Sequence, residues 1–163
     1  MFVHTPNTKP LPQLKRKNED GRRVYYDTEG NRYHSVTNVV GSIDEKGLEE
    51  WRNAVGEDVA NYVSRRAMNL GTKLHTMVET YLYNKKNTEK NIFAKAHFDN
   101  IKPLLQPIAN IRGLEEKMCS KDLGLAGTAD CIAEYNGELS IIDFKTSSKK
   151  KQEDWILKYF LQT

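Results

Sequence analysis

Cysteine is scarce in this sequence, and long hydrophobic runs are missing. Cys119 and Cys131 are the only cysteines among 163 residues. They cannot supply the four thiolates of a zinc or iron–sulfur centre, and they do not resemble the disulfide framework of a small secreted domain. No apolar run approaches the ~20 residues that a transmembrane helix needs, so we expect no membrane-spanning segment. A reducing compartment fits this composition.

Two common catalytic signatures are also missing from the sequence. No Gly-x-Ser-x-Gly elbow is found, so nothing points to a serine hydrolase with a covalent intermediate. No Walker phosphate-binding loop is found either, so we do not expect an ATP-driven helicase. What remains is 38% hydrophobic and 29% charged residues, with a mean hydropathy of −0.70, which is typical of one soluble globular domain.

The net charge of +3 is concentrated at the N-terminus. Up to Arg23, six cationic residues stand against Glu19 and Asp20, which gives +4 there and leaves −1 for the remainder. We therefore predict a basic, flexible arm over residues 1–23 and a folded domain over residues 24–163. The arm has two interpretations, a segment that contacts phosphates or a solvated leader. The six residues are Lys9, Lys15, Arg16, Lys17, Arg22 and Arg23.

The hydrophobic pattern changes its period along the chain. Residues 24–36 predict a β-hairpin, and residues 44–83 and 89–101 have the three- and four-residue spacing of helices. Three strand-like segments follow from about residue 111, and residues 153–163 are helical in pattern. Because this last pattern continues up to Thr163, we expect the domain to be truncated at its C-terminus. The fold class predicted is α/β, with a helical N-terminal half.

The dipeptide Asn136-Gly137 is the strongest short-range signal for a β-hairpin. With these two residues as the loop, cross-strand pairs sum to 273 in residue number, so Asp130 lies opposite Asp143, and Lys145 shares their face. Two carboxylates at ~5 Å repel by roughly 3 kcal/mol at an effective dielectric of about 20, unless a divalent cation lies between them. The alternatives are a solvated pair neutralised in part by Lys145, or a bulge that changes the register.

The segments GLAGTAD and IIDFKTS resemble the core of the PD-(D/E)xK nucleases. They are most similar to the RecB-like exonuclease branch, which includes phage exonucleases and the mitochondrial genome maintenance exonuclease type. GTKLH, residues 71–75, resembles the Gly-x-x-x-His motif of this branch, and Gln162 resembles the Gln of its Gln-x-x-x-Tyr motif. The resemblance implies a restriction-endonuclease-like core, in which a small mixed sheet is flanked by helices.

The resemblance also implies roles for individual residues. Asp130, Asp143 and the backbone carbonyl of Phe144 would bind the metal, with His75 as a further ligand, and Lys145 would be catalytic. The imidazole of His75 suits Mn²⁺ better than Mg²⁺. An acidic residue of the preceding strand would support the site, and the alignment favours Glu115 over Glu116, which would point to the opposite face.

Several residues would contact nucleic acid. Gly71, four residues before His75 on the same helical face, would allow the hairpin or DNA to approach closely. Gln162 would contact substrate from the last helix. Lys149, Lys150 and Lys151 would neutralise the backbone near the scissile bond, or else form a charged turn exposed to water.

Together these features predict a DNA exonuclease that depends on Mg²⁺ or Mn²⁺ and hydrolyses phosphodiester bonds in recombination, repair or phage DNA processing. The alternatives are a non-catalytic nucleic-acid-binding module with a nuclease fold, or a sequence-specific endonuclease. We expect single-stranded DNA or duplex ends as the partner, with replication or recombination proteins as further candidates. The expected location is the cytoplasm of a bacterium or a phage-infected host rather than a mitochondrion.

Overall fold

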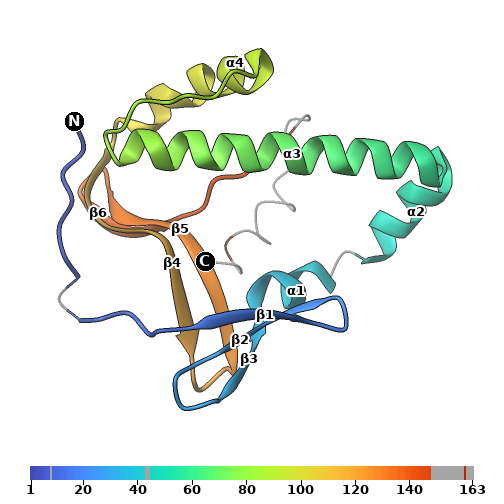
Figure 1. Cartoon of the computed structure of the whole chain (residues 1–163), viewed down its shortest axis with the longest axis horizontal. Coiled ribbons are helices and arrows are strands. Elements are labelled where there is room, and N and C mark those ends of the chain that lie inside the picture. The colour runs from blue at the N-terminus through green and yellow to red at the C-terminus, as the bar shows by residue number, and fades with distance from the viewer. Residues whose placement is uncertain (8, 43–44, 148–159, 161–163) are drawn as a thin grey trace.

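The computed structural model describes residues 1–7, 9–42, 45–147 and 160, and shows a mixed α/β fold (Figure 1). Three strands come first: β1 (Lys15–Glu19), β2 (Arg22–Tyr26) and β3 (Arg32–Ser35). Helices follow, namely α1 (Val36–Gly41), α2 (Glu45–Val55), α3 (Glu57–Leu82) and α4 (Ile92–Ile101), with a 3₁₀ turn over Lys102–Leu105. The described strands end with β4 (Ile108–Ser120), β5 (Leu125–Tyr135) and β6 (Glu138–Ile142).

These strands form one curled, mixed sheet organised around β5. The order is β1-β2-β3-β5-β4, and β6 also pairs with β5. The start of β5 pairs in parallel with β3, through His34 and Leu125, whereas its end pairs in antiparallel with β6, from Cys131 to Tyr135. β4 runs antiparallel along β5, with a register shift between Ala109 and Gly113. Between the β3 and β6 segments, no ladder pairing of β5 other than that with β4 is found in the described chain.

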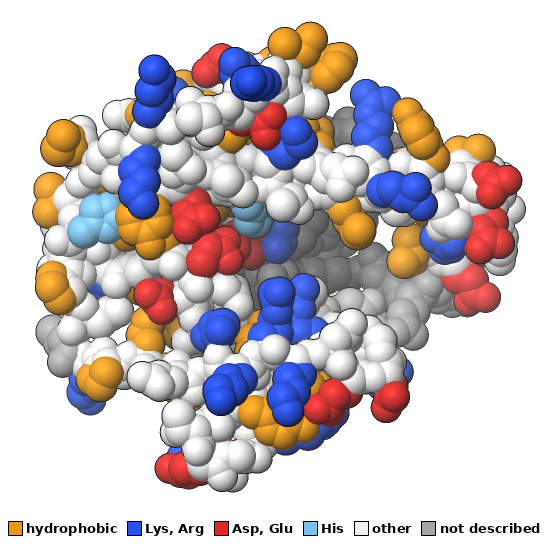
Figure 2. Space-filling model, viewed as in Figure 1, with side chains coloured by type: hydrophobic (Ala, Val, Ile, Leu, Met, Phe, Trp, Pro, Cys, Tyr) orange, Lys and Arg blue, Asp and Glu red, His pale blue; other side chains and the backbone are white. Residues whose placement is uncertain are grey.

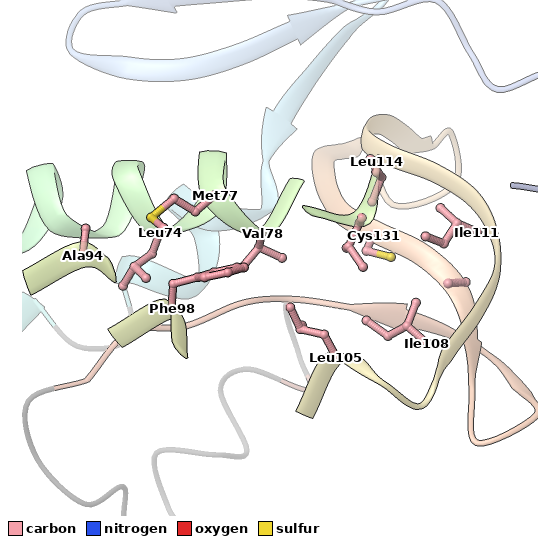
Figure 3. Packing of buried hydrophobic residues seen from close by; sticks show 12 residues of the cluster. Leu74, Met77, Val78, Ala94, Phe98, Leu105, Ile108, Ile111, Leu114 and Cys131 are labelled. Carbon is pink, nitrogen blue, oxygen red and sulfur yellow. The ribbon is translucent and has the colours of Figure 1, made fainter. Parts of the chain in front are cut away.

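Helix α3 lies across the sheet and α4 packs on α3 (Figure 1). The C-terminal part of α3 is amphipathic, and it contributes Leu74, Met77, Val78 and Leu82 to the core. Figure 3 shows the main cluster, in which these side chains meet Phe98 and residues of β4 and β5. A second, smaller cluster contains Leu14, Tyr25, Tyr33 and Ala126. In the described part of the chain, no helix is long and apolar enough to cross a bilayer.

Most predicted elements are confirmed. The hairpin at residues 24–36 corresponds to β2 and β3, the helical region 44–83 to α2 and α3, and the strand-like segments to β4, β5 and β6. The pairing of β5 with β6 has the predicted register, since Tyr135 faces Glu138 and Cys131 faces Ile142. The helix predicted over residues 153–163 lies outside the described residues, except for Phe160.

The N-terminal region differs from the prediction of a flexible arm over residues 1–23. From Lys15 onward the chain forms β1 and the first half of a hairpin with β2. Before β1, Leu14 is buried, and Val3 and Thr5 exchange backbone hydrogen bonds with Ile111 of β4. The turn at Asp20-Gly21, a hairpin dipeptide of the same kind as Asn136-Gly137, explains the difference. The N-terminal half thus contains a third strand, β1, in addition to the predicted hairpin and helices.

Candidate metal centre

Three side chains from three different elements converge beneath α3. They are His75 of α3, Glu115 of β4 and Asp130 of β5. Each offers one ligand atom, and these atoms all lie within 4.8 Å of one another. Figure 2 shows acidic side chains and a histidine gathered in this hollow between α3 and the sheet. The arrangement places one imidazole and two carboxylates around a common point.

Local structure determines the position of each of these side chains. On α3, Leu74 and Met77 face the core, so His75 lies at the border of that face, with 31% of its side chain exposed. Its ring meets the ring of Phe144 edge to face at 6.4 Å. On β4, Glu115 has a left-handed backbone with φ of 54°, and it interrupts the ladder between the pairs of Leu114 and Glu116. A non-glycine residue in this conformation is uncommon and often marks a functional site.

The electrostatics of the centre favour a cation. Burial raises the pKa of Asp130, and the nearby charge of Asp143 adds to this, while the backbone N–H of Phe144 and the charge of His75 act against it. Burial, followed by the charge of Asp130, also raises the pKa of Glu115. A raised carboxyl pKa means that the anionic form is disfavoured at this position. A bound divalent cation would relieve this cost, because it stabilises the anionic carboxylates.

The donor set fits a divalent ion. Two carboxylates are ligands that both Mg²⁺ and Mn²⁺ accept, and imidazole is a ligand that suits Mn²⁺. The Nδ1 atom of His75 lies 3.6 Å from Oδ2 of Asp130, a separation at which the two do not form a short hydrogen bond. Both atoms therefore remain available as ligands of the same ion.

The predicted opposition of Asp130 and Asp143 is not part of the ladder. The last pair of the β5–β6 ladder is Cys131 and Ile142, one step before the two aspartates. Oδ2 of Asp130 accepts a hydrogen bond of 2.7 Å from the backbone N–H of Phe144. The carboxylate of Asp143 accepts one of 2.8 Å from the ammonium of Lys145. The strand ends here because its backbone donor is bound to a side chain.

Asp143 is accordingly not among the three converging groups, although its charge acts on Asp130. The backbone N–H of Phe144 contacts Asp130, and the role of its carbonyl as a metal ligand stays a prediction. Lys145 is linked to the centre through Asp143, because its ammonium donates to that carboxylate and the charge of Asp143 acts on Asp130. The acidic group supplied by β4 is that of Glu115, because the side chain of Glu116 lies over Gly113 instead.

Gly71 lies beside the segment that follows β6. A Cβ atom added to it would meet Oγ1 of Thr146 at 3.7 Å, which is ordinary van der Waals contact. The helix and the end of the hairpin thus approach closely at this point. Lys149, Lys150, Lys151 and Gln162 lie outside the described residues.

The sequence patterns did not place Arg16 beside the centre. Arg16 falls within the predicted arm, but it lies on β1, and its charge acts on Glu115, lowering the pKa that burial raises. The signal that would have placed it was the dipeptide Asp20-Gly21, which turns β1 back onto β2.

Comparison with known proteins finds similarity to curated exonucleases. Over 111 residues, or 64% of this chain, it is 29% identical to mitochondrial genome maintenance exonuclease 1 of Homo sapiens. It is 32% identical to the protein of the same name from Mus musculus over 111 residues, and 27% identical to that from Xenopus tropicalis over 112 residues. The matched region makes up 32% of each relative, so the chain spans about a third of their length. No family model matches the chain.

Proposed function

We propose that this chain is a metal-dependent nuclease that hydrolyses phosphodiester bonds of DNA, and that it acts as an exonuclease. The observation that carries the proposal is the convergence of the ligand atoms of His75, Glu115 and Asp130 within 4.8 Å. Glu115 and Asp130 come from the consecutive strands β4 and β5, and His75 comes from α3, which precedes them by more than one element. A fold gains no stability from bringing two partly buried carboxylates together, so a ligand that needs them explains the arrangement.

The relatives support the same function. The proteins from Homo sapiens, Mus musculus and Xenopus tropicalis are named as exonucleases. We extend their activity to this chain as part of the proposal, together with the restriction-endonuclease-like core and the role in recombination, repair or phage DNA processing that the motifs GTKLH, GLAGTAD and IIDFKTS imply.

In this proposal His75, Glu115 and Asp130 hold one Mn²⁺ or Mg²⁺ ion. When bound, such an ion lowers the pKa of a coordinated water and polarises the scissile phosphate. The backbone N–H of Phe144 fixes the orientation of Asp130 through its bond of 2.7 Å. Lys145, whose ammonium donates to Asp143, places a positive charge near the reacting phosphate and stabilises the charge that develops there.

Metal binding and DNA degradation test the proposal together. We expect Glu115→Gln and Asp130→Asn each to lower the Mn²⁺ affinity, measured by titration calorimetry, by more than about 100-fold. The rate of DNA degradation should fall by more than about 100-fold as well. Residues that only support a metal ligand already contribute ~10- to 100-fold, so the loss of a ligand should cost more. Asp130→Asn removes a charge whose burial is unfavourable. In chelator, the midpoint temperature of its thermal unfolding should therefore be at least as high as that of the wild type.

Glu116→Gln is the matched control, because it makes the same change one residue away at a side chain outside the centre. It should bind Mn²⁺ and degrade DNA as the wild type does. Wild-type protein that binds no Mn²⁺ and degrades no DNA would refute the proposal, as would full activity in Asp130→Asn. Covalently closed circular DNA distinguishes the exonuclease from an endonuclease, because only the endonuclease cuts it.

A further inference from the structure

The hairpin of β1 and β2 carries five cationic side chains, and its register sorts them onto two faces. Arg16 pairs with Tyr25, and Asn18 pairs with Arg23, so Arg16 and Arg23 are diagonal neighbours on one face. The other three cations, Lys15, Lys17 and Arg22, belong to the opposite face. All five are exposed.

The face of Lys15, Lys17 and Arg22 has internal partners for its charges. Glu19 stands opposite Arg22, and its carboxylate forms an ion pair with Arg32 at 3.2 Å. The ammonium of Lys17 lies 4.9 Å from the centre of the Tyr26 ring. A cleft next to α1 is lined by Arg22 and Arg32, and it is reached from the other face by Arg23.

The face of Arg16 and Arg23 has no acidic residue of its own within the hairpin. The positions that share it are Asn18 and Tyr25. Among the residues that the structure describes, neither guanidinium forms an ion pair within 4 Å. The charge of Arg16 acts instead on Glu115, a residue of the metal centre.

Three contacts hold this face in a fixed position beside the metal centre. The hydroxyl of Tyr25 lies 3.3 Å from Oγ1 of Thr128, two residues before Asp130 on β5. The ammonium of Lys117, which is paired with Thr128 across the sheet, donates to the carbonyl of Leu14 at 2.9 Å, directly before β1. The parallel pairing of β3 with β5 is the third contact. Figure 2 shows Lys and Arg side chains gathered over β1 and β2, next to the acidic hollow.

We infer that Arg16 and Arg23 bind the phosphodiester backbone of the DNA strand whose scissile phosphate lies at the metal centre. Arginine is suited to this contact, because its planar guanidinium donates two hydrogen bonds to a phosphate. A divalent ion at the centre only offsets the charge of the two carboxylates, so further positive charge is needed to attract the phosphates of the strand. The two arginines are therefore positioning residues, and this role rests on the proposed function.

Binding of a fluorescein-labelled single-stranded oligonucleotide, followed by anisotropy in chelator, tests the inference without any chemical step. We expect the double variant Arg16→Gln/Arg23→Gln to bind about tenfold more weakly than the wild type. The slope of the logarithm of its binding constant against the logarithm of salt concentration should be shallower by about 1.4, since each phosphate contact on a single strand contributes ~0.7. In Mn²⁺, KM for DNA should rise about as much as the dissociation constant, with kcat changed less than about twofold.

Lys17→Gln/Arg22→Gln is the matched control, because it removes the same charge from the same two strands on the opposite face. It should leave affinity and salt dependence within about twofold of the wild type. Equal losses in both double variants would overturn the inference in favour of a general effect of net charge. A loss confined to the control would assign DNA to the face of Lys17 and Arg22 instead.

The outcome also separates this inference from the proposed function. If the wild type degrades DNA and Arg16→Gln/Arg23→Gln is unchanged in affinity and KM, the nuclease stands and the inference fails. If neither the wild type nor any variant degrades DNA, but Arg16→Gln/Arg23→Gln alone loses affinity, the two arginines form a DNA-binding surface. In that case the inference stands and the proposed nuclease function fails.

Discussion

The two ends of β5 are built differently, although they belong to one strand. The start, from Leu125, pairs with β3, and Ala126 packs into the small cluster with Tyr25 and Tyr33. The end pairs with β6, and Cys131 and Ala133 pack into the large cluster beneath α3. Ala126 is even-numbered and Cys131 and Ala133 are odd-numbered, so the two clusters use opposite sides of the strand.

Asp130 lies between Ala126 and Cys131, and neither cluster includes it. A strand residue enclosed by a core has to be apolar, whereas a residue between two cores can be a carboxylate. The comparison indicates that the candidate metal centre lies at the boundary between the two clusters. The centre is partly buried because both clusters adjoin it.

The largest expected difference between the two clusters is in stability. Leu82 is fully buried in the large cluster, and Leu14 is 6% exposed in the small one. We expect Leu82→Ala to lower the free energy of unfolding by about 4 kcal/mol and Leu14→Ala by about 2 kcal/mol, because the larger cluster leaves a less collapsible cavity. Urea denaturation measures both. A larger cost for Leu14→Ala would show that the small cluster dominates.

The two turns should behave alike, in contrast to the two cores. Gly21 in the hairpin of β1 and β2 has φ of 76°, and Gly137 in the hairpin of β5 and β6 has φ of 85°. Neither would meet another atom within 4 Å on gaining a Cβ, so only backbone strain is involved. We expect Gly21→Ala and Gly137→Ala each to cost about 1 kcal/mol in thermal or urea unfolding. A cost confined to Gly137→Ala would mean that the first hairpin contributes little to the folded state.

The smallest expected effect is a pH-dependent contribution of Asp27 to stability. The side chain of Asn31, followed by the hydroxyl of Tyr33 and the backbone of the loop, lowers the pKa of Asp27 to about 2. Because this pKa is below the ordinary value of 3.8, ionised Asp27 stabilises the fold above that value, and the contribution is lost as pH falls toward 2. Asp27→Ala should therefore be less stable than the wild type at neutral pH, and the two should converge near pH 2. A difference independent of pH would contradict this account.

The sequence allowed some of these features to be predicted because they depend on local chemistry. The dipeptide Asn136-Gly137 predicted the register of β5 and β6, and the three- and four-residue spacing predicted the helical region that α2 and α3 occupy. The strand β1 was missed because four of its five residues are exposed and the segment has no apolar alternation. Its position depends on pairing with β2, which a pattern of hydrophobic residues does not reveal.

The geometry of the candidate centre depends on tertiary contacts. The alternation of side chains along a strand could not predict it. The opposition of Asp130 and Asp143 assumed that the ladder continues past Ile142, whereas the N–H of Phe144 binds the side chain of Asp130 instead. The left-handed conformation of Glu115 is equally invisible in the sequence, because nothing in Leu-Glu-Glu requires it.

Among the described residues, strand β1 ends the sheet and pairs with β2 alone, so its other side is an edge of the sheet. Natural sheets often protect such an edge with lysine and other charged residues, since like charges oppose the pairing of two copies. The run Lys15, Arg16 and Lys17 places three cations on this edge. We therefore expect the hairpin that supplies positive charge beside the carboxylates also to oppose pairing of two copies through the backbone of β1.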